Sequence, residues 1–426
     1  RSYARSWIRD GAMISEGLLR LGHEAIAADY LRWYAPHQFE NGKIPCCVDA
    51  RGADPVPEND SAGELIFLAA EVYRFTRDRA LLEAMWPHVE AAARYLETLR
   101  QSERTPANLT PERRALYGLL PPSISHEGYS AKPAYSYWDD FWALEGFEDA
   151  TEIAATLGHV EARDRLARQR DEFRHDLHAS LRASTAAHGI AYLPGAADLG
   201  DFDPTSTTIA LSPVGEGHNL PQDLLLPTFE RYWQEFVARR DGTREWNDYT
   251  PYELRVIGTF IRLGWRARIQ ELLGFFFADR RPAAWNQWAE VVGREPRKPR
   301  FIGDMPHAWI SSDYIRAALD MFAYEREADQ TLVLAAGVPP AWLDAPGISI
   351  RNLRTPYGPL SYFITRAGSR VTLAITSQPR VPGGLVWPWP WDQPPGPARI
   401  NGKPAPWHGN ELRISDLPAE IVVDAR

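Results

Sequence analysis

Cysteine is nearly absent from this chain, and so are the residue patterns that usually mark a metal site. The 426 residues include only two cysteines, Cys46 and Cys47, and these are adjacent. Adjacent cysteines disfavour an ordinary disulfide with each other and match no metal-ligand spacing. No other cluster of His, Cys and carboxylates has such a spacing, although a calcium ion held by loop carbonyls would leave no trace in a sequence. We therefore expect no metal and no cofactor, and the cysteines leave the compartment open, cytoplasmic or exported.

Long apolar runs and basic blocks are lacking too. No stretch approaches the roughly 18 uninterrupted apolar residues of a membrane helix. The net charge is −9, and Lys and Arg are scattered along the chain. We expect a soluble protein with neither a membrane nor a nucleic acid as its partner, while the oligomeric state stays open.

An initiating Met and a leader segment are also missing. The first residue is Arg, and no charged and apolar leader with a small-residue cleavage site stands before the first helical pattern. This predicts a fragment or a processed product that lacks a preceding N-terminal region.

Tryptophan, in contrast, is abundant. The chain has sixteen Trp, and 44% of its residues are hydrophobic, enough for a sizeable core. Trp stacks on flat apolar faces while offering one N–H donor. Sugar rings present such faces, so this composition favours a carbohydrate ligand.

Helical periodicity dominates the first part of the chain. Apolar residues recur at helical spacing up to about residue 326, for example at Leu65, Leu68, Val72 and Phe75. Helix pairs of about 40 to 50 residues would build a toroid of helical hairpins with a cavity where loops converge. We therefore predict a mainly α fold, an (α/α)6 toroid, over residues 1–328.

Long loops rich in Pro, Gly and aromatic residues separate these helices. They span Glu40 to Ser61, Leu119 to Tyr135, Tyr192 to Asn219 and Arg281 to His307. Loops of this length in a compact domain are functional or disordered. Their Trp and Tyr content favours function.

The end of the chain has a different pattern. After Ala328, short β-branched segments such as TLVLAAG, RVTLAITS and EIVVD alternate with Gly, Pro and Asn turn signals. We predict a small C-terminal β-sandwich-like domain over residues 329–426. Its segment VWPWPWD, Val386 to Asp392, is a stacking surface or, as we prefer, a Pro-interrupted loop packed against the helical domain.

Three stretches combine carboxylates with Trp at the ends of helical segments. They are SWIRDG near residue 7, YSYWDDFWALEG near residue 138 and WNQWAEVVG near residue 288. Glycosidic bond cleavage needs a carboxylic acid that protonates the leaving oxygen and a carboxylate across the sugar. The second and third stretches can supply that pair.

The second stretch contains two neighbouring carboxylates after Trp138. On a helix, consecutive side chains diverge by roughly 100°, so only one of Asp139 and Asp140 can aim into a cavity. One is then the acid and the other a helper. Alternatively, both are N-terminal helix carboxylates that favour the dipole and do nothing else.

The third stretch places Glu290 after Trp288 and ahead of a basic segment. Aromatic neighbours can dry and position a carboxylate that activates water, but this Glu can also simply pair with the nearby basic residues. His307 and Trp309 precede the last helical stripe of the domain. A histidine there is either part of the site or a satisfied loop residue.

The first stretch places Trp7, Arg9 and Asp10 directly before a helical stripe of Ile14, Leu18 and Leu21, which we expect to be buried. Arg9 and Asp10 could grip sugar hydroxyls as donor and acceptor. Alternatively, Asp10 caps the helix and Arg9 pairs with an acid.

Together, these stretches resemble the six-hairpin glycosidases, which include glucoamylases, trehalases and processing α-glucosidases. WIRDG is similar to the element that holds the terminal sugar, which implies that role for Arg9 and Asp10. YWDDFW resembles the element that bears the general acid, implying Asp139 rather than Asp140. WAEVVG followed by MPHAW resembles the loop that supplies the base, implying Glu290.

The β domain looks like those of rhamnosidase-like members of this group. Two departures stand against the resemblance: the Glu290 loop lacks the usual Asn- and Gly-rich wording, and Asp140 replaces a small or amide residue.

The resemblance implies an exo-acting, inverting glycoside hydrolase with an oligosaccharide or glycoconjugate as substrate. Asp139 and Glu290 would be catalytic. The predicted substrate-binding residues are Trp7, Arg9, Asp10, Trp138, Asp140, Trp288, His307 and Trp309.

Two other functions stay open from the sequence alone. One is a glycan-binding protein that kept the barrel without its chemistry. The other is a sugar epimerase or lyase, for which His37, His126, Tyr129 and His307 are candidate bases.

Overall fold

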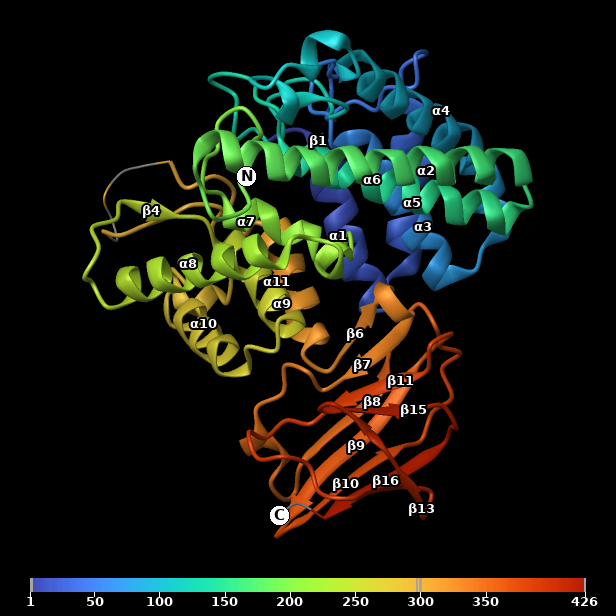
Figure 1. The fold of residues 1–426 in the computed structure, drawn as a ribbon, viewed down its shortest axis with the longest axis vertical. Coiled ribbons are helices and arrows are strands. Elements are labelled where there is room, and N and C mark those ends of the chain that lie inside the picture. Colours follow the sequence, from blue (N-terminus) through green and yellow to red (C-terminus); the bar gives the residue numbers. More distant parts are fainter. Residues whose placement is uncertain (1–2, 296–297, 299–300, 425–426) are drawn as a thin grey trace.

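The computed structural model describes residues 3–295, 298 and 301–424 and divides them into a helical domain and a β domain (Figure 1). No helix among these residues is long and apolar enough to cross a membrane.

The helical domain is built on a closed ring of contacting inner helices. Around the ring, α1 contacts α3, α3 contacts α5, and the contacts continue through η4 and α9 to α11, which returns to α1. The inner elements are α1 (Ile8–Arg20), α3 (Ser61–Thr76), α5 (Tyr137–Leu157), α7 (Pro204–Thr207) with η4 (Thr208–Ala210), α9 (Arg255–Arg262) and α11 (Ala308–Asp320).

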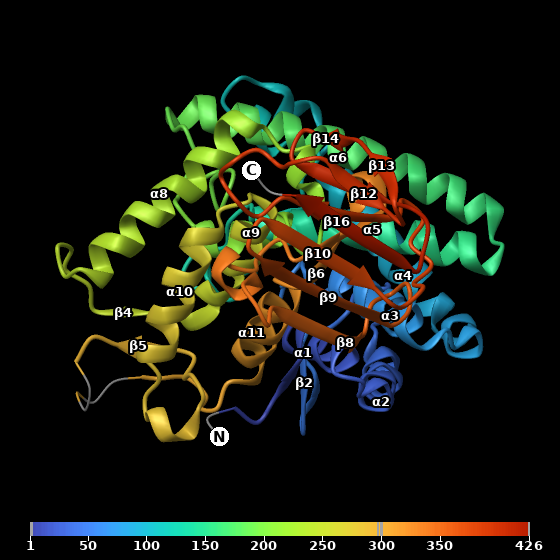
Figure 2. The ribbon, with the colours of Figure 1, turned by 90° about the horizontal axis from the view of Figure 1, so that it is seen from below.

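Each inner helix except the last is followed by one that packs outside it. These are α2 (Glu24–Tyr34), α4 (Arg79–Glu103), α6 (Val160–His188), α8 (Gln222–Arg240) and α10 (Arg266–Ala278). The alternation of inner and outer helices confirms the predicted toroid of helical hairpins (Figures 1 and 2). It also means that all the inner helices run in the same direction.

The inner helices α3 and α5 are apolar over most of their surface, as helices buried on all sides are. In α5, Trp138, Trp142 and Phe147 are all buried. The helix ends at Gly158, whose φ of 83° suits the left-handed terminal position that favours glycine. Burial of this kind fixes the direction of the residues at the start of α5, which form part of the site described below.

The predicted burial of the first stripe is wrong in part. Ile14 and Leu18 are only half-buried and Leu21 is 49% exposed, whereas Met13 and Leu19 of the same helix are fully buried. With residues of α2, Ile14 and Leu18 line a groove of about 750 Å³. Helical spacing identifies residues that share a face, but the neighbouring helices decide whether that face is covered.

Two antiparallel-dominated sheets form the C-terminal domain, with strand orders β13-β12-β16-β10-β9-β8 and β14-β15-β11-β7-β6. Their strands are β6 (Ala323–Arg326), β7 (Thr331–Leu334), β8 (Ile348–Leu353), β9 (Leu360–Ala367), β10 (Arg370–Ile375), β11 (Leu385–Pro388), β12 (Ala398–Ile400), β13 (Lys403–Ala405), β14 (Trp407–His408), β15 (Glu411–Ile414) and β16 (Ala419–Asp424). A shared apolar core joins the sheets, as the predicted sandwich requires. Because β6 belongs to it, the sandwich begins at Ala323, ahead of the predicted boundary at 329.

The Trp-Pro segment is only in part the loop that we expected, since residues 389–392 lie outside any strand. Its first residues form β11, which pairs with β15 and β7. Trp387 and Trp389 are buried in the core of the β domain. The segment also contacts the helical domain, because Arg266 of α10 donates to the carbonyls of Pro388 and Trp389, and Val386 belongs to the core cluster of the helical domain. The prolines are tolerated because Pro388 ends the strand, where fewer ladder hydrogen bonds are lost.

Candidate active site

A pocket of about 370 Å³ lies at the N-terminal end of the inner ring. Since the inner helices run in the same direction, the residues at the start of each converge on it. The pocket is lined by Tyr3, Trp7, Arg9, Asp10, His126, Glu127, Gly128, Trp138, Asp203, Thr205, Ser206, Thr250, Tyr252, Arg255, Glu290, His307 and Trp309. Its volume is in the range of small-molecule sites, and its polar groups converge from several elements.

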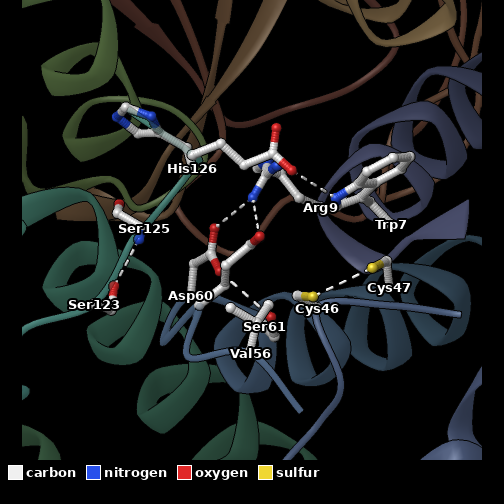
Figure 3. A network of polar contacts seen from close by, with 12 residues as sticks. Trp7, Arg9, Cys46, Cys47, Val56, Asp60, Ser61, Ser123, Ser125 and His126 are labelled. Atoms are coloured by element: carbon white, nitrogen blue, oxygen red, sulfur yellow. Dashed lines mark hydrogen bonds and ion pairs between the residues drawn. The ribbon is translucent and has the colours of Figure 1, made fainter. Parts of the chain in front are cut away.

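Arg9 lies in the first turn of α1 and is held by two acids. Its Nη1 donates to Glu58 Oε2 at 2.6 Å and to Asp60 Oδ2 at 3.3 Å (Figure 3). Trp138 Nε1 donates to the same Asp60 oxygen at 2.8 Å. Arg9 therefore does pair with acids, as one of our alternatives held, and this buried cluster fixes Trp138 as a wall of the pocket.

Asp10 is a pocket carboxylate without a partner in the described part of the chain. The residue before α1 is Trp7, and no side chain caps the helix, so the capping alternative for Asp10 is wrong. Burial raises the pKa of Asp10, while Arg9 and His307 oppose the shift. The carboxylate is available to accept hydrogen bonds from a ligand.

Glu290 is the best-positioned candidate base. Tyr3 Oη donates to its Oε2 at 2.6 Å, and the backbone N–H of Asp304 donates to the same oxygen at 3.2 Å. The other oxygen, Oε1, has only a long contact of 3.5 Å with Tyr252 Oη. One oxygen is thus anchored and the other can accept a proton.

Gly303 makes this position of Glu290 possible. Its φ is +66°, and a Cβ atom there would lie 2.0 Å from Glu290 Oε2. Backbone hydrogen bonds from Glu290 N to Asp304 O and from Val291 N to Ile302 O join the two segments. Only glycine leaves room for the carboxylate here.

His307 lies beside Glu290 and contacts Tyr252. The Tyr252 Oη and His307 Nε2 atoms are 2.6 Å apart, and the Tyr252 ring also lies against Trp309. Burial raises the pKa of Tyr252 well above its ordinary value, so its phenol stays protonated. A protonated phenol is a donor rather than the base that a lyase would need.

Glu127 is a pocket carboxylate that the sequence did not single out. It is exposed, and its Oε1 accepts a hydrogen bond from Trp7 Nε1 at 3.2 Å. Its φ is 65°, a left-handed conformation that is uncommon for a residue other than glycine. Strained residues of this kind cluster at functional sites.

A polar cluster of His126, Asp203 and Ser206 forms another wall and was also missed. Ser206 Oγ contacts His126 Nε2 at 2.9 Å and donates to Asp203 Oδ2 at 2.6 Å. Burial alone would raise the pKa of Asp203, but hydrogen bonds and charge attraction from His126, with Ser206, lower it to about 2. Asp203 is therefore an ionised acceptor rather than a proton donor.

Arg255 lines the pocket between the rings of Trp138 and Trp309. Its guanidinium carbon lies 5.1 Å from the ring centre of Trp138 and 5.2 Å from that of Trp309. Its nearest acid is Asp313, at 3.8 Å. Burial lowers the pKa of Arg255, although Asp313 opposes the shift. Arg255 and the two Trp rings offer hydrogen-bond donors and flat faces to a sugar.

The structure does not bring Asp139 or Asp140 into the pocket. Asp139 is 1% exposed, and its Oδ2 accepts a hydrogen bond from Ser123 Oγ behind Trp138. Asp140 is fully buried and accepts from the backbone N–H of Leu120. Burial raises the pKa of both carboxyl groups well above their ordinary value, so they stay neutral behind the wall.

Trp288 also lies outside the lining. Its Nε1 donates to the carbonyl of Phe276 at 3.0 Å, and its ring packs against Phe277 and Tyr314. It supports the Glu290 loop from behind instead of forming a wall.

The remaining predicted residues lie in the pocket together: Trp7, Arg9, Asp10, Trp138, His307 and Trp309, with Glu290. The missed residues come from loops that the sequence did identify, since Glu127 lies between Leu119 and Tyr135, and Asp203 between Tyr192 and Asn219. The composition of these loops was the only signal that the sequence offered for them, because neither residue stands beside a Trp.

The sequence also offered candidate bases for a lyase. His126 lines the pocket, as His307 does, whereas Tyr129 donates to Asp201 and His37 packs against Trp33.

One group among the described residues could hold a metal ion. The Cys46, Cys47 and Asp54 ligand atoms lie within 4.8 Å of one another, and the two Sγ atoms are 3.3 Å apart. Figure 3 shows the two thiols near the Arg9 cluster, but none of the three residues lines the pocket. The sequence spacing gave no hint of this group because Asp54 is brought in by the β2–β3 turn (Cys47–Asp49, Gly52–Ala53).

No protein-family model matches the sequence, and no curated protein matches it. Solved structures do. An α-L-rhamnosidase from Dictyoglumus thermophilum is 12% identical with a TM-score of 0.58, and the match covers 98% of this chain and 46% of that one. An α-L-rhamnosidase from Streptomyces avermitilis, complexed with L-rhamnose, is 13% identical with a TM-score of 0.57 over 98% and 38% of the two chains.

An α-L-rhamnosidase from Aspergillus terreus is 11% identical, with a TM-score of 0.54 over 96% of this chain and 45% of that one. The chain thus spans less than half the length of these enzymes. At this identity the likeness is one of fold alone. This chain has the six-hairpin glycosidase fold with a rhamnosidase-like C-terminal β domain.

Proposed function

We propose that this protein is a glycoside hydrolase that removes a terminal sugar from an oligosaccharide or glycoconjugate with inversion of configuration. The observation that carries the proposal is Glu290, anchored through one oxygen in an aromatic-walled pocket that also holds a second, separate carboxylate. Glycoside hydrolysis needs two such carboxyl groups with different roles.

Glu290 acts as the base in this mechanism. Tyr3 and the Asp304 N–H hold Oε2, so Oε1 takes a proton from water, and the water oxygen attacks the anomeric carbon. Asp10 accepts hydrogen bonds from sugar hydroxyls, and Arg255 donates to them. Trp138 and Trp309 stack against the ring.

We assign the acid role to Glu127 and not to the predicted Asp139. Glu127 reaches the pocket, whereas Asp139 lies behind Trp138. The side chains of Trp7 and Tyr3 link the two carboxylates: Trp7 donates to Glu127, Tyr3 donates to Glu290, and their ring centres are 5.4 Å apart. An inverting enzyme requires space for a sugar and a water between its two carboxyl groups. Glu127 protonates the glycosidic oxygen as its bond to the anomeric carbon breaks.

The test is sugar release from a panel of α- and β-linked glycosides that begins with α-L-rhamnosides, the sugar named for the structural neighbours. Wild type is compared with Glu290→Gln, Glu127→Gln and Asp139→Asn, and Glu161→Gln on the exposed face of α6 serves as the matched control. NMR of the first product identifies its anomer. No turnover of any glycoside by wild type would reject the proposal.

Leaving-group dependence separates the two candidate acids. An acid variant should lose about 10²–10⁴-fold on alkyl glycosides but far less on aryl glycosides whose leaving group needs no proton. We expect this pattern for Glu127→Gln. If Asp139→Asn shows it instead, the acid is Asp139 and the protein opens around Trp138 during turnover.

A further inference from the structure

A second cavity, of about 340 Å³, lies at the opposite end of the inner ring. It is lined by residues from the middle and the C-terminal part of α1, α3 and α5, by the end of α9, and by residues of the β domain. In Figure 1 this is the side where α1 and α3 approach β6 and β7. The cavity therefore lies between the domains and away from the pocket with Glu290.

The lining is strongly acidic. It holds eight carboxylates and four arginines: Glu16, Glu71, Glu145, Glu148, Asp149, Glu152, Glu325 and Glu327, with Arg20, Arg74, Arg77 and Arg262. Arg74 pairs with Glu71, Asp149 and Glu152, and Arg20 pairs with Glu16 and Glu325. Arg174 and Arg316, outside the lining, also pair with Glu148 and Glu16, and the eight carboxylates still outnumber these six arginines.

Glu145 is a buried side chain that these pairs leave out. It is 7% exposed and lines the cavity, and its carboxylate makes no hydrogen bond or ion pair among the described residues. Asp149 Oδ2 also has no hydrogen-bond partner. Burying an unpaired carboxylate is costly, and burial with the nearby Asp149 and Glu148 raises the pKa of Glu145 well above its usual value.

The backbone adds to this negative field. The inner helices present their C-terminal ends to the cavity, where each carries a partial negative charge. A cation placed among these ends is favoured by the helix dipoles as well as by the side chains.

The spacing of the carboxylates selects the kind of cation. In the described part of the chain, the group that can hold a metal ion is Cys46, Cys47 and Asp54, and it does not lie in this cavity. The acidic oxygens here are too dispersed for one small ion. Phe67, Val214, Pro356 and Tyr357 line the same cavity and give it apolar surface.

We propose that this cavity binds an aliphatic di- or polyamine, with one ammonium group on Glu145 and Asp149 and the methylene chain against the apolar wall. The ligand would lie between the two domains and stabilise their contact. This site is independent of the glycosidase function proposed above.

The test uses putrescine and spermidine as probes of the 426-residue chain, by calorimetric titration and thermal unfolding at pH 8. Magnesium chloride at matched ionic strength controls for screening, and 1,4-butanediol controls for the neutral chain. We expect saturable binding to wild type, at least tenfold weaker binding to Glu145→Gln, and unchanged binding to Glu161→Gln. Because the amide removes an unpaired buried charge, Glu145→Gln should not lower the thermal stability without amine.

Glu327→Gln, at the same cavity, provides a second reading if Glu145→Gln does not fold. It should weaken binding less, because Glu327 is more exposed than Glu145. The inference is overturned if the diol or magnesium reproduces the effect, if no amine binds, or if Glu145→Gln binds as tightly as Glu161→Gln. Loss of binding in Glu290→Gln alone would place the amine in the other pocket and would also overturn it.

Discussion

The two ends of the inner helical ring both collect carboxylates, but in opposite electrostatic settings. At the N-terminal end, positive helix dipoles, Arg9, Arg255 and two histidines face Asp10, Glu127, Asp203 and Glu290. At the C-terminal end, negative dipoles add to eight carboxylates that the four lining arginines, together with Arg174 and Arg316, only partly balance. The first setting offers positive charge and hydrogen-bond donors to a ligand, whereas the second favours protonation of its acids or a bound cation. Both settings arise because inner and outer helices alternate along the chain, so that all the inner helices run in the same direction.

The largest expected difference between the ends is in turnover. Glu290→Gln should lower kcat by about 10²–10⁴-fold with little change in stability, because it removes the proton acceptor that we propose. Glu145→Gln should leave kcat within about twofold, since its side chain lies at the other end. Steady-state kinetics of both variants beside wild type measure this, and equal losses would show that the two ends are not separate in function.

The next largest effect is a loss of folding stability when the buried ion pairs of Arg9, at the N-terminal end of the ring, are broken. Arg9→Leu leaves Glu58 and Asp60 buried without their cation, which should destabilise the fold by about 3–5 kcal/mol. Urea unfolding measures the change. A loss below 1 kcal/mol would mean that the two acids become protonated at little cost, which is testable because burial already raises the pKa of Glu58 to about 8.

A smaller loss of kcat is expected when Gly303, which leaves room for the proposed base Glu290, is replaced. In Gly303→Ala, the added methyl group would meet Glu290 Oε2, so the carboxylate must move, and kcat should fall about tenfold. Gly402→Ala is the matched control, since Gly402 also has a positive φ, and its Cβ would meet no atom within 4 Å. If both variants have wild-type kcat, the anchored position of Glu290 is not required for turnover.

The smallest effect is the pH dependence of stability that Glu145 contributes at the C-terminal end. Burial raises the pKa of Glu145 well above its usual value. The folded state then holds protons that the unfolded chain has released above about pH 4.3, so stability falls as pH rises towards 8. Glu145→Gln should recover about 1–2 kcal/mol of this loss at pH 8 and nothing at pH 4. Thermal unfolding across that range measures it, with Glu161→Gln as the control.

Much of the fold could be predicted from the sequence because its signals are local. Helical spacing identified the helical domain, and short β-branched segments between turn residues identified the β domain. The Leu119–Tyr135, Tyr192–Asn219 and Arg281–His307 loops contribute to the pocket, and Glu58 and Asp60 of the Glu40–Ser61 loop hold Arg9. In each case the pattern is a property of residues that are close along the chain.

The misses have physical reasons. Asp139 and Glu127 are both acids near the start of α5, and nothing in their neighbours tells which one reaches the cavity. Ser123 and Trp138 settle that in space, by covering Asp139. The Ile14 stripe was predicted to be buried because it is apolar, but coverage depends on which helices lie against α1.

The sequence by itself determined a helical domain, a β domain, and a set of loops in which tryptophan and carboxylates meet. It could do so because periodicity and composition act over a few residues. Only the tertiary structure decided that Glu290 is anchored by Tyr3, that Glu127 lines the pocket and Asp139 does not, and that Glu145 lies unpaired at the far end. These arrangements depend on contacts between helices that are distant in the sequence and run in the same direction around one ring. Local sequence patterns do not reveal such contacts.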